Sequence, residues 1–175
     1  MELGDLRPLM DNATRGVFRL ETLPQYLVPQ EAERFAAFRA GHHVPPRAPE
    51  SSEWLAKLQQ IIASGIRWYR VHVLDFPLCD YSLFELYAYQ DSQKVGQEIF
   101  LADRAEHLVL EDMHEDFWLM DDDVAVRMVY DKEGHFLRPE RIDDATPYVT
   151  LRETAMRCAE PMDEFIARRN PKLTI

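Results

Sequence analysis

The sequence has few cysteines and no long apolar run. Its 175 residues include two cysteines, Cys79 and Cys158, which lie far apart without CxxC spacing. This pattern argues against a disulfide scaffold or a cysteine zinc site and is typical of a reducing cytoplasm. No segment approaches the roughly 20 apolar residues of a membrane span, and the acidic N-terminus lacks the basic start of a signal peptide. We therefore expect a soluble cytoplasmic protein with no membrane partner.

Basic residues are also scarce. The chain has 20 Lys and Arg against 31 Asp and Glu, which gives a formal net charge of −11. Phosphate backbones attract the opposite charge, so we expect no direct contact with nucleic acid. Apolar residues make up 46% of the chain, which is enough for a folded core, and the length fits one domain rather than two.

The first 50 residues contain several prolines and are expected to form an irregular arm. The arm includes an extended piece at 16–20 and a short surface helix that Pro29 opens and Gly41 ends. A proline-rich linker without packed structure follows at 42–49. The predicted organisation is an arm with a short helix and linker at residues 1–50, a single α/β domain at residues 51–168 and a frayed tail at residues 169–175.

The domain is expected to begin with a helix and an interior strand. Ser51 or Ser52 caps the helix, one face of which is apolar, and Gly65 ends it. The following run, 66–74, is rich in aromatic and β-branched residues. Its apolar content on both faces predicts a strand inside the sheet.

Residues 81–95 have two readings. They fit a helix with Asp80 as N-cap and Gly96 at its end, and part of the segment also alternates well enough to form a strand. We favour the helix because the cap and the glycine enclose a segment of helical length. Residues 99–101 then form a strand parallel to 66–74, which completes a β-α-β unit.

The densest apolar stretch of the chain predicts an antiparallel hairpin. Two apolar runs, 117–120 and 124–130, lie on either side of the acidic turn 121–123. We expect a third strand at 135–142. The last helix should begin with Thr146 as N-cap and carry a kink at Pro161.

The start of the hairpin resembles one half of the phospholipase D superfamily. That superfamily carries H-x-K-x-x-x-x-D, and here His114 and Asp121 have the matching spacing while Asp116 occupies the lysine position. The order of strand, helix, strand, acidic loop and hairpin is also similar. The resemblance implies an α/β phospholipase-D-like half domain, a mixed sheet flanked by helices. An acid in the lysine position would repel a phosphodiester, and a second copy of the motif is absent, which argues against phosphodiesterase activity.

A second resemblance covers roughly residues 18–160. It rests on Phe18-Arg-x-Glu21 with Tyr26, Asp80-Tyr81 with Phe84-Glu85, Gly96-Gln-Glu-Ile99, Asp116-Phe-Trp-Leu-x-Asp121-Asp and Tyr130-Asp-x-x-Gly134. These pieces are similar to an uncharacterised family of small actinobacterial proteins often encoded beside helix-turn-helix regulators. The DFWLxDD piece is the most specific. The resemblance implies a cytoplasmic location and a regulatory association, and it assigns no activity.

The candidate catalytic residues are His114, Asp121, Asp80 and Tyr81. His114 and Asp121 bracket the first hairpin strand, where they could contact a ligand, supply a nucleophile or only close the strand end against the turn. Asp80 and Tyr81, with Glu85, could supply a general acid and base. The alternative for these three is a helix cap, a packed tyrosine and a surface acid.

The candidate ligand-binding residues are Glu85, Asp116 and Trp118. The acids between Asp112 and Asp123 offer the oxygen ligands that Mg²⁺ and Ca²⁺ prefer. They lack the glycine-bearing spacing of a calcium loop, so we favour a solvated acidic face. We predict no metal site and no cofactor.

The favoured hypothesis is a non-catalytic accessory protein in regulation that binds a protein partner or a small ligand. A basic partner, such as a helix-turn-helix regulator, would suit the negative charge. The alternative is an enzyme that reuses a degenerate phospholipase-D-like pocket, with His114 and Asp121 in acid/base or positioning roles. Convergence of the four candidate catalytic side chains in one cleft would favour the enzyme.

Overall fold

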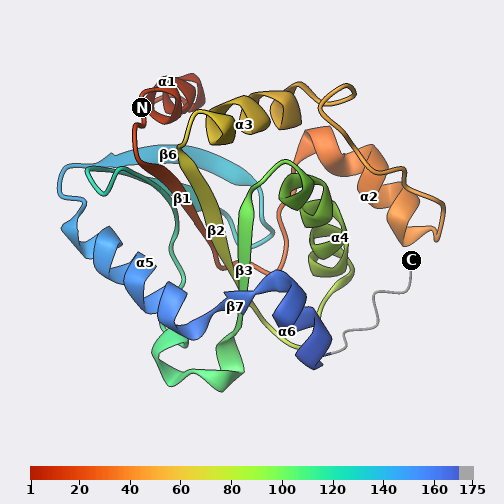
Figure 1. Ribbon diagram of the computed structural model, residues 1–175. Coiled ribbons are helices and arrows are strands. Elements are labelled where there is room, and N and C mark those ends of the chain that lie inside the picture. Colours follow the sequence, from red (N-terminus) through yellow and green to blue (C-terminus); the bar gives the residue numbers. More distant parts are fainter. Residues whose placement is uncertain (170–175) are drawn as a thin grey trace.

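The computed structural model, which describes residues 1–169, is built around a mixed sheet of seven strands in the order β6-β5-β4-β1-β2-β3-β7 (Figure 1). Strands β1, β2 and β3 are parallel, and every other neighbouring pair is antiparallel. The strands are β1 (Gly16–Glu21), β2 (Arg67–Leu74), β3 (Glu98–Asp103), β4 (Asp116–Met120), β5 (Val124–Tyr130), β6 (Phe136–Ile142) and β7 (Glu160–Pro161).

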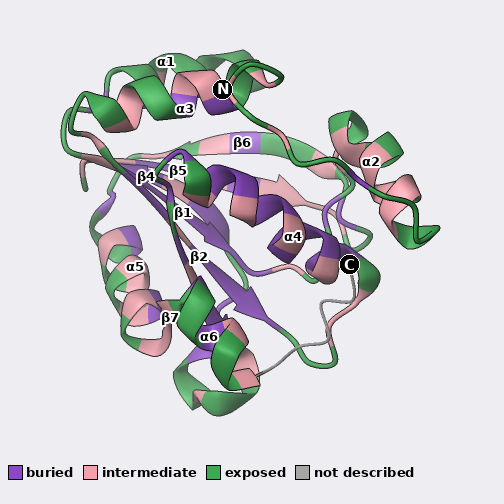
Figure 2. Ribbon diagram, turned by 45° about the vertical axis from the view of Figure 1, so that its right-hand side comes forward, coloured by how far each residue is buried: buried purple, intermediate pink, exposed green. Residues whose placement is uncertain are grey.

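Helices cover both faces of the sheet, and the strands between them are mostly buried (Figure 2). The helices are α1 (Leu6–Asp11), α2 (Ala32–Arg39), α3 (Glu53–Ala63), α4 (Asp80–Lys94), α5 (Thr146–Cys158) and α6 (Met162–Arg169). Short 3-10 turns are η1 (Leu3–Asp5), η2 (Pro29–Glu31), η3 (Arg104–Glu106) and η4 (Leu108–Leu110). We call the face under α5 the α5 face, and the face under α1, α3 and α4 the α4 face.

The alternation of side chains along β1 explains why it needs both layers. Phe18 and Leu20 belong to the core under α5, while Val17 packs in a separate core with α1 and α3. Because successive side chains of a strand point to opposite faces, Arg19 and Glu21 lie on the same face as Val17. The centre of the α4 face therefore carries charged groups, and its apolar contacts lie to the side of them.

Most of the predicted elements are confirmed. The segment with two readings forms the helix α4 (Asp80–Lys94), which ends one residue earlier than expected, and β2, α4 and β3 make the predicted parallel β-α-β unit. The hairpin of β4 and β5 is present, with left-handed backbone at Asp121 (φ 54°) and Asp122 (φ 65°), a conformation that aspartate tolerates in turns. Ser52 caps α3 by accepting a hydrogen bond from the Leu55 backbone N–H.

Several predictions about the ends of elements are wrong. Cys79, not Asp80, is the N-cap of α4, and its Sγ accepts from the Ser82 N–H. The helix predicted as the last one is α5, which has Ala145 as N-cap and ends at Cys158. Pro161 lies in β7 rather than at a kink within a helix. Proline lacks the N–H that a continuous helix would need at that position, so the chain breaks there and starts α6.

The N-terminal third is more closely tied to the fold than predicted. A domain beginning at residue 51 leaves out β1, which lies between β2 and β4 in the sheet. The linker 42–49 also packs on α4: Val44 is buried and accepts a hydrogen bond from the Tyr87 hydroxyl, and the Arg47 N–H donates to Asp91 at 2.9 Å. Of the tail expected at 169–175, Arg169 ends α6, and the remainder lies outside the described residues.

Candidate functional site

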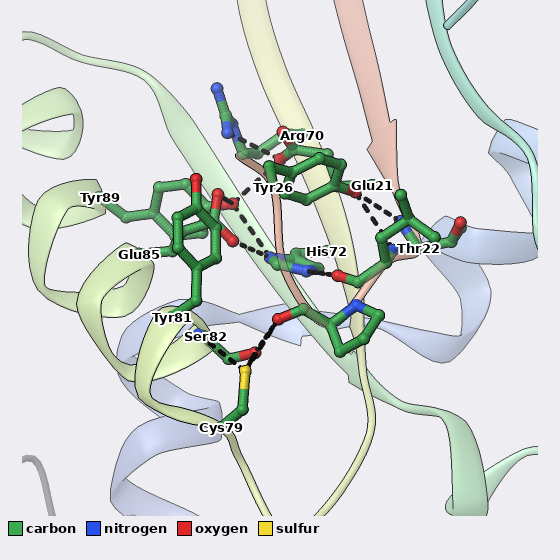
Figure 3. A network of polar contacts seen from close by, with 12 residues as sticks. Glu21, Thr22, Tyr26, Arg70, His72, Cys79, Tyr81, Ser82, Glu85 and Tyr89 are labelled. Atoms are coloured by element: carbon green, nitrogen blue, oxygen red, sulfur yellow. Dashed lines mark hydrogen bonds and ion pairs between the residues drawn. The ribbon is translucent and has the colours of Figure 1, made fainter. Parts of the chain in front are cut away.

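The charged centre of the α4 face is a network at the carboxyl ends of β1 and β2, closed by α4 and by the segment after β1 (Figure 3). Glu21 and His72 are register partners on β1 and β2. Charged residues are seldom buried unless they are paired. Arg19, Glu21, His72, Glu85 and Asp116 are nevertheless all 8% exposed or less, so the network has to satisfy their charges internally.

Asp116, the first residue of β4, holds one end of the network. It accepts hydrogen bonds from Arg19 (2.9 Å), from the Tyr26 hydroxyl (2.6 Å), and from both the backbone N–H and the hydroxyl of Thr22 (2.9 and 2.7 Å). Burial raises the pKa of Asp116, and Arg19 with the hydrogen bonds of Tyr26 and Thr22 acts against this rise. The carboxylate fixes the chain as it leaves β1.

Glu21 is the centre of the network. Its carboxylate accepts from Arg70 at 2.7 Å and from the Tyr89 hydroxyl at 2.9 Å, and Arg19 Nε lies 3.5 Å away. Burial alone would raise the pKa of Glu21, but Arg70 and Arg19 outweigh it and lower the pKa to about 2. Arg70 also lies over the ring of Tyr89, 4.7 Å from its centroid. Glu21 is therefore ionised and neutralised.

His72 is neutral, and its tautomer follows from its partners. Burial lowers the pKa of His72. Its Nε2 lies 3.2 Å from the carbonyl oxygen of Leu23, which can only accept, so Nε2 carries the proton. Nδ1 is then an acceptor, 3.0 Å from the Tyr89 hydroxyl and 3.5 Å from Glu85 Oε2.

Glu85 differs from the other acids of the network. Its Oε1 accepts a long hydrogen bond of 3.4 Å from Tyr89, and its buried Oε2 has no hydrogen-bond partner. Burial, and next Glu21, raise the pKa of Glu85 well above its ordinary value. The single proton of the Tyr89 hydroxyl cannot serve Glu21, His72 and Glu85 together, and a protonated Glu85 supplies a second one. The raised pKa favours the neutral carboxylic acid at Glu85, beside the neutral imidazole of His72.

Two cavities lie beside this network. A polar cavity of about 200 Å³ is lined by Glu21, Tyr26, Val28, Glu31, Arg47, Trp54, Arg70, Tyr81, Glu85, Ala88, Tyr89, Ser92 and Tyr130. A more apolar cavity of about 410 Å³ lies under α2 and is lined by Tyr26, Leu27, Val28, Pro29, Glu31, Ala32, Phe35, Ala36, Arg39, Tyr81 and His135. They share four residues, Tyr26, Val28, Glu31 and Tyr81, so the two spaces adjoin.

Two groups of described side chains have the geometry of metal ligands. The ligand atoms of Glu21, His72 and Glu85 lie within 4.8 Å of one another, as do those of Asp131, Glu133 and His135. In the first group the Glu21 carboxylate already pairs with Arg70 and Arg19 and accepts from the Tyr89 hydroxyl, so its oxygens are not free to bind a metal ion. In the second, Asp131 accepts from the backbone N–H groups of residues 133 and 135 in an exposed turn. Both groups are accounted for by protein contacts.

His114 and Asp121 do not form a pair. They lie beyond opposite ends of β4, about 20 Å apart at the rise of an extended strand. His114 is exposed, and Asp121 accepts from the backbone N–H groups of Thr14, Arg15 and Gly16 at 2.7–2.9 Å. Burial would raise the pKa of Asp121, but these three N–H groups lower it to about 2. Asp121 orients the entry to β1.

The other candidates divide into those at the cavities and those away from them. Tyr81 lines both cavities and donates to Glu31 at 3.0 Å, and Glu85 lines the polar cavity. Asp80 is exposed beside Arg39 (3.4 Å). Asp116 is closed off by its own partners. The ring of Trp118 packs under Arg19, 5.3 Å from the guanidinium carbon. Neither Asp116 nor Trp118 lines either of the two cavities described above.

Sequence reasoning missed Arg19, Glu21, Arg70, His72 and Tyr89. A signal for them is present: β1 and β2 each carry two ionisable residues at alternate positions inside otherwise apolar runs. Alternation places such residues on one face, and an interior strand has no solvent to receive them. The ionisable side chains of β1 and β2 therefore had to be paired with buried charged groups on neighbouring elements.

Residues 4–167 match a protein family described as a domain of unknown function, DUF6879. The chain belongs to this family. The match agrees with the predicted relation to an uncharacterised family, and it includes β1 and the arm as well as the residues beyond 51. None of the curated proteins compared with the chain matches it. Among residues 1–169, no helix combines the length and the apolar character needed to cross a membrane.

Proposed function

We propose that this DUF6879 protein binds a small polar molecule in the polar cavity and acts without catalysis, as an accessory component of regulation. The observation that supports the proposal is unused hydrogen-bonding capacity among the groups that line the polar cavity. Glu85 Oε2, Arg70 Nε and Arg47 Nε are buried without a hydrogen-bond partner among residues 1–169, and all three residues line the cavity. Buried polar atoms normally have partners, which a bound molecule would supply.

The size of the cavity limits the ligand. Pockets for drug-sized molecules are typically about 300–1,000 Å³, and the polar cavity is about 200 Å³. A ligand held by this space alone would be a small metabolite.

The regulatory part of the proposal has a different support. It comes from the resemblance to actinobacterial proteins encoded beside helix-turn-helix regulators, and from the net charge of −11, which favours a basic protein partner. A distant relation to one half of the phospholipase D fold is part of the same proposal. The β2-α4-β3 unit followed by a hairpin is its support.

An enzyme is the second candidate, because one observation favours it. A protonated carboxyl group beside a cavity, as at Glu85, is a common form of general acid. Of the residues first considered, Tyr81 and Glu85 line the polar cavity and would act there together with Tyr89, and His72 lies behind Glu85. His114 and Asp121 have no part in it because they lie elsewhere.

A retention experiment tests the proposal. The protein is incubated with cell extract, washed, and denatured, and the released small molecules are identified by mass spectrometry. Ala88→Leu narrows the polar cavity, and Ala63→Leu, on the exposed end of α3, is its matched control. We expect the wild type and Ala63→Leu to retain the same molecule and Ala88→Leu to lose it. Retention by all three, or by none, would contradict the proposal. Conversion of the retained molecule by wild type but not by Glu85→Gln would favour the enzyme.

A further inference from the structure

We infer that the ligand of this protein is an organic cation with an apolar group, whose charged head lies in the polar cavity and whose apolar group lies in the adjoining cavity under α2. The inference rests on the proposed function and specifies its ligand. It depends on which charges around the two cavities already have partners, and on how the cavities join.

Two of the acids that line the polar cavity have no basic partner within the described part of the chain. Its two arginines each have a carboxylate: Arg70 pairs with Glu21 at 2.7 Å, and Arg47 lies 3.8 Å from Asp91. Two lining acids, Glu31 and Glu85, have no lysine or arginine at ion-pair distance in residues 1–169. Among these residues, the Glu31 side chain accepts only from the Tyr81 hydroxyl, and the one basic side chain within ion-pair distance of Glu85 is the neutral His72. A ligand that completes the pairing is therefore a cation.

The aromatic lining points the same way. Tyr26, Tyr81, Tyr89, Tyr130 and Trp54 all line the polar cavity. Faces of tyrosine and tryptophan attract ammonium groups through their ring quadrupoles, and such aromatic cages are a known means of binding organic cations. An ammonium group would meet carboxyl groups and aromatic side chains within one small space.

The adjoining cavity supplies the place for an apolar group. Val28, Ala32 and Phe35 line it, and its volume is about 410 Å³, whereas a benzene ring is accommodated in a protein cavity of about 150 Å³. Glu31 and Tyr81 line both spaces, so a molecule with its ammonium group beside Glu31 can extend into either. The distance between head and apolar group is then only a few bonds.

A cation next to Glu85 would change its protonation. The charged and titratable groups that face Glu85 are Glu21 of β1, Arg70 and His72 of β2, Tyr81 and Tyr89 of α4, Glu31 of η2, Tyr26 of the segment after β1 and Asp116 of β4. Without a ligand, burial and Glu21 keep the pKa of Glu85 high. An ammonium group favours the carboxylate, so binding of the cation should release a proton to the buffer.

The test uses four probes that separate charge from apolar size. 2-Phenylethylamine is the cation, 3-phenylpropanoate the matched anion, 2-phenylethanol the neutral analogue, and ethylamine the cation without the ring. Calorimetric titrations are made at neutral pH in two buffers of different ionisation enthalpy. We expect phenylethylamine to release a proton and to bind at least about tenfold more tightly than each of the other three. A hydrogen bond to a charged group contributes roughly ten- to hundredfold over the anion and the neutral analogue, and burial of the phenyl ring contributes a similar factor over ethylamine.

Two variants locate the binding. Glu85→Gln should weaken phenylethylamine binding by about tenfold or more and abolish the proton release, while Glu33→Gln, the same substitution on the exposed side of α2, should change neither. Tighter binding of phenylpropanoate would overturn the cation and leave the proposed small-ligand function standing. Equal binding to Glu85→Gln, or no binding of any probe, would also overturn the inference, whereas the proposed function is judged by the retention experiment alone.

Discussion

Removal of Asp116 should cost this protein a large part of its stability. Its carboxylate neutralises Arg19 and accepts from Thr22 and Tyr26, and the side chain is only 2% exposed. Asp116→Ala leaves a buried guanidinium with Glu21 at 3.5 Å as its nearest carboxylate. Breaking a buried pair in this way costs about 3–5 kcal/mol, and domains are stable by only about 5–15 kcal/mol in total.

Urea unfolding, followed by the fluorescence of the three tryptophans, measures the loss. Glu111→Ala, in the exposed acidic loop, is the control and should change the free energy of unfolding by no more than about 0.5 kcal/mol. The double variant Arg19→Met with Asp116→Leu should recover about half of the loss, because it removes the unpaired charge as well. The Tyr26 and Thr22 hydroxyls would still lack their acceptor, so recovery should be incomplete.

The result that refutes the reasoning is specific. A loss below about 1 kcal/mol for Asp116→Ala would mean that Arg19 finds solvent or another partner at little cost. A double-mutant cycle without coupling between residues 19 and 116 would mean that the pair does not act as a unit. Either outcome would remove the basis for treating the centre of the α4 face as a closed ionic network.

Two further predictions concern Glu85 and Gly134. The pKa of Glu85 is raised in the folded state, so the contribution of Glu85 to stability is complete below its ordinary pKa near 4.5 and is lost as the pH rises toward the folded pKa. The stability of Glu85→Gln should therefore change less between about pH 5 and 8 than that of the wild type, and the variant should be the more stable protein at about pH 8. Equal pH dependence of the two proteins in thermal unfolding would contradict this prediction. Gly134 has φ 93°, and a Cβ there would lie 2.5 Å from the Gln25 carbonyl oxygen, whereas Gly65, at φ 92°, has open space. Both alanine variants incur about 1–3 kcal/mol of backbone strain, so Gly134→Ala should be clearly the less stable of the two in the same denaturation assay, and equal losses would exclude the clash.

The elements that could be predicted are those whose signals are local. The cap at Ser52, the glycine after α4 and the acidic turn between two apolar runs depend on the few residues around each of them. The position of β1 could not be read in this way. Its neighbours are β2 and β4, which lie about 50 and 100 residues further along the chain, and no nearby residue indicates that pairing.

The residues of the candidate site also divide into those that a local sequence pattern indicates and those that only contacts between distant segments bring together. Spacing along the sequence brought His114 and Asp121 into one motif, yet a strand between them holds them apart. Tyr81 and Glu85 were found because their acid and hydroxyl groups share a helical segment. Their partners on β1 and β2 were not, because the register of parallel strands places Glu21 beside His72, although 51 positions separate them.

By itself, the sequence determined the α/β class, the β-α-β unit, the hairpin and the strongly acidic charge, because each depends on composition or on contacts within a few residues. Only the tertiary structure decided which charges are buried together, that Asp116 faces an arginine rather than a ligand, and that two cavities meet at Glu31 and Tyr81. Those outcomes depend on which strands become neighbours, and that choice is made by the packing of the whole chain.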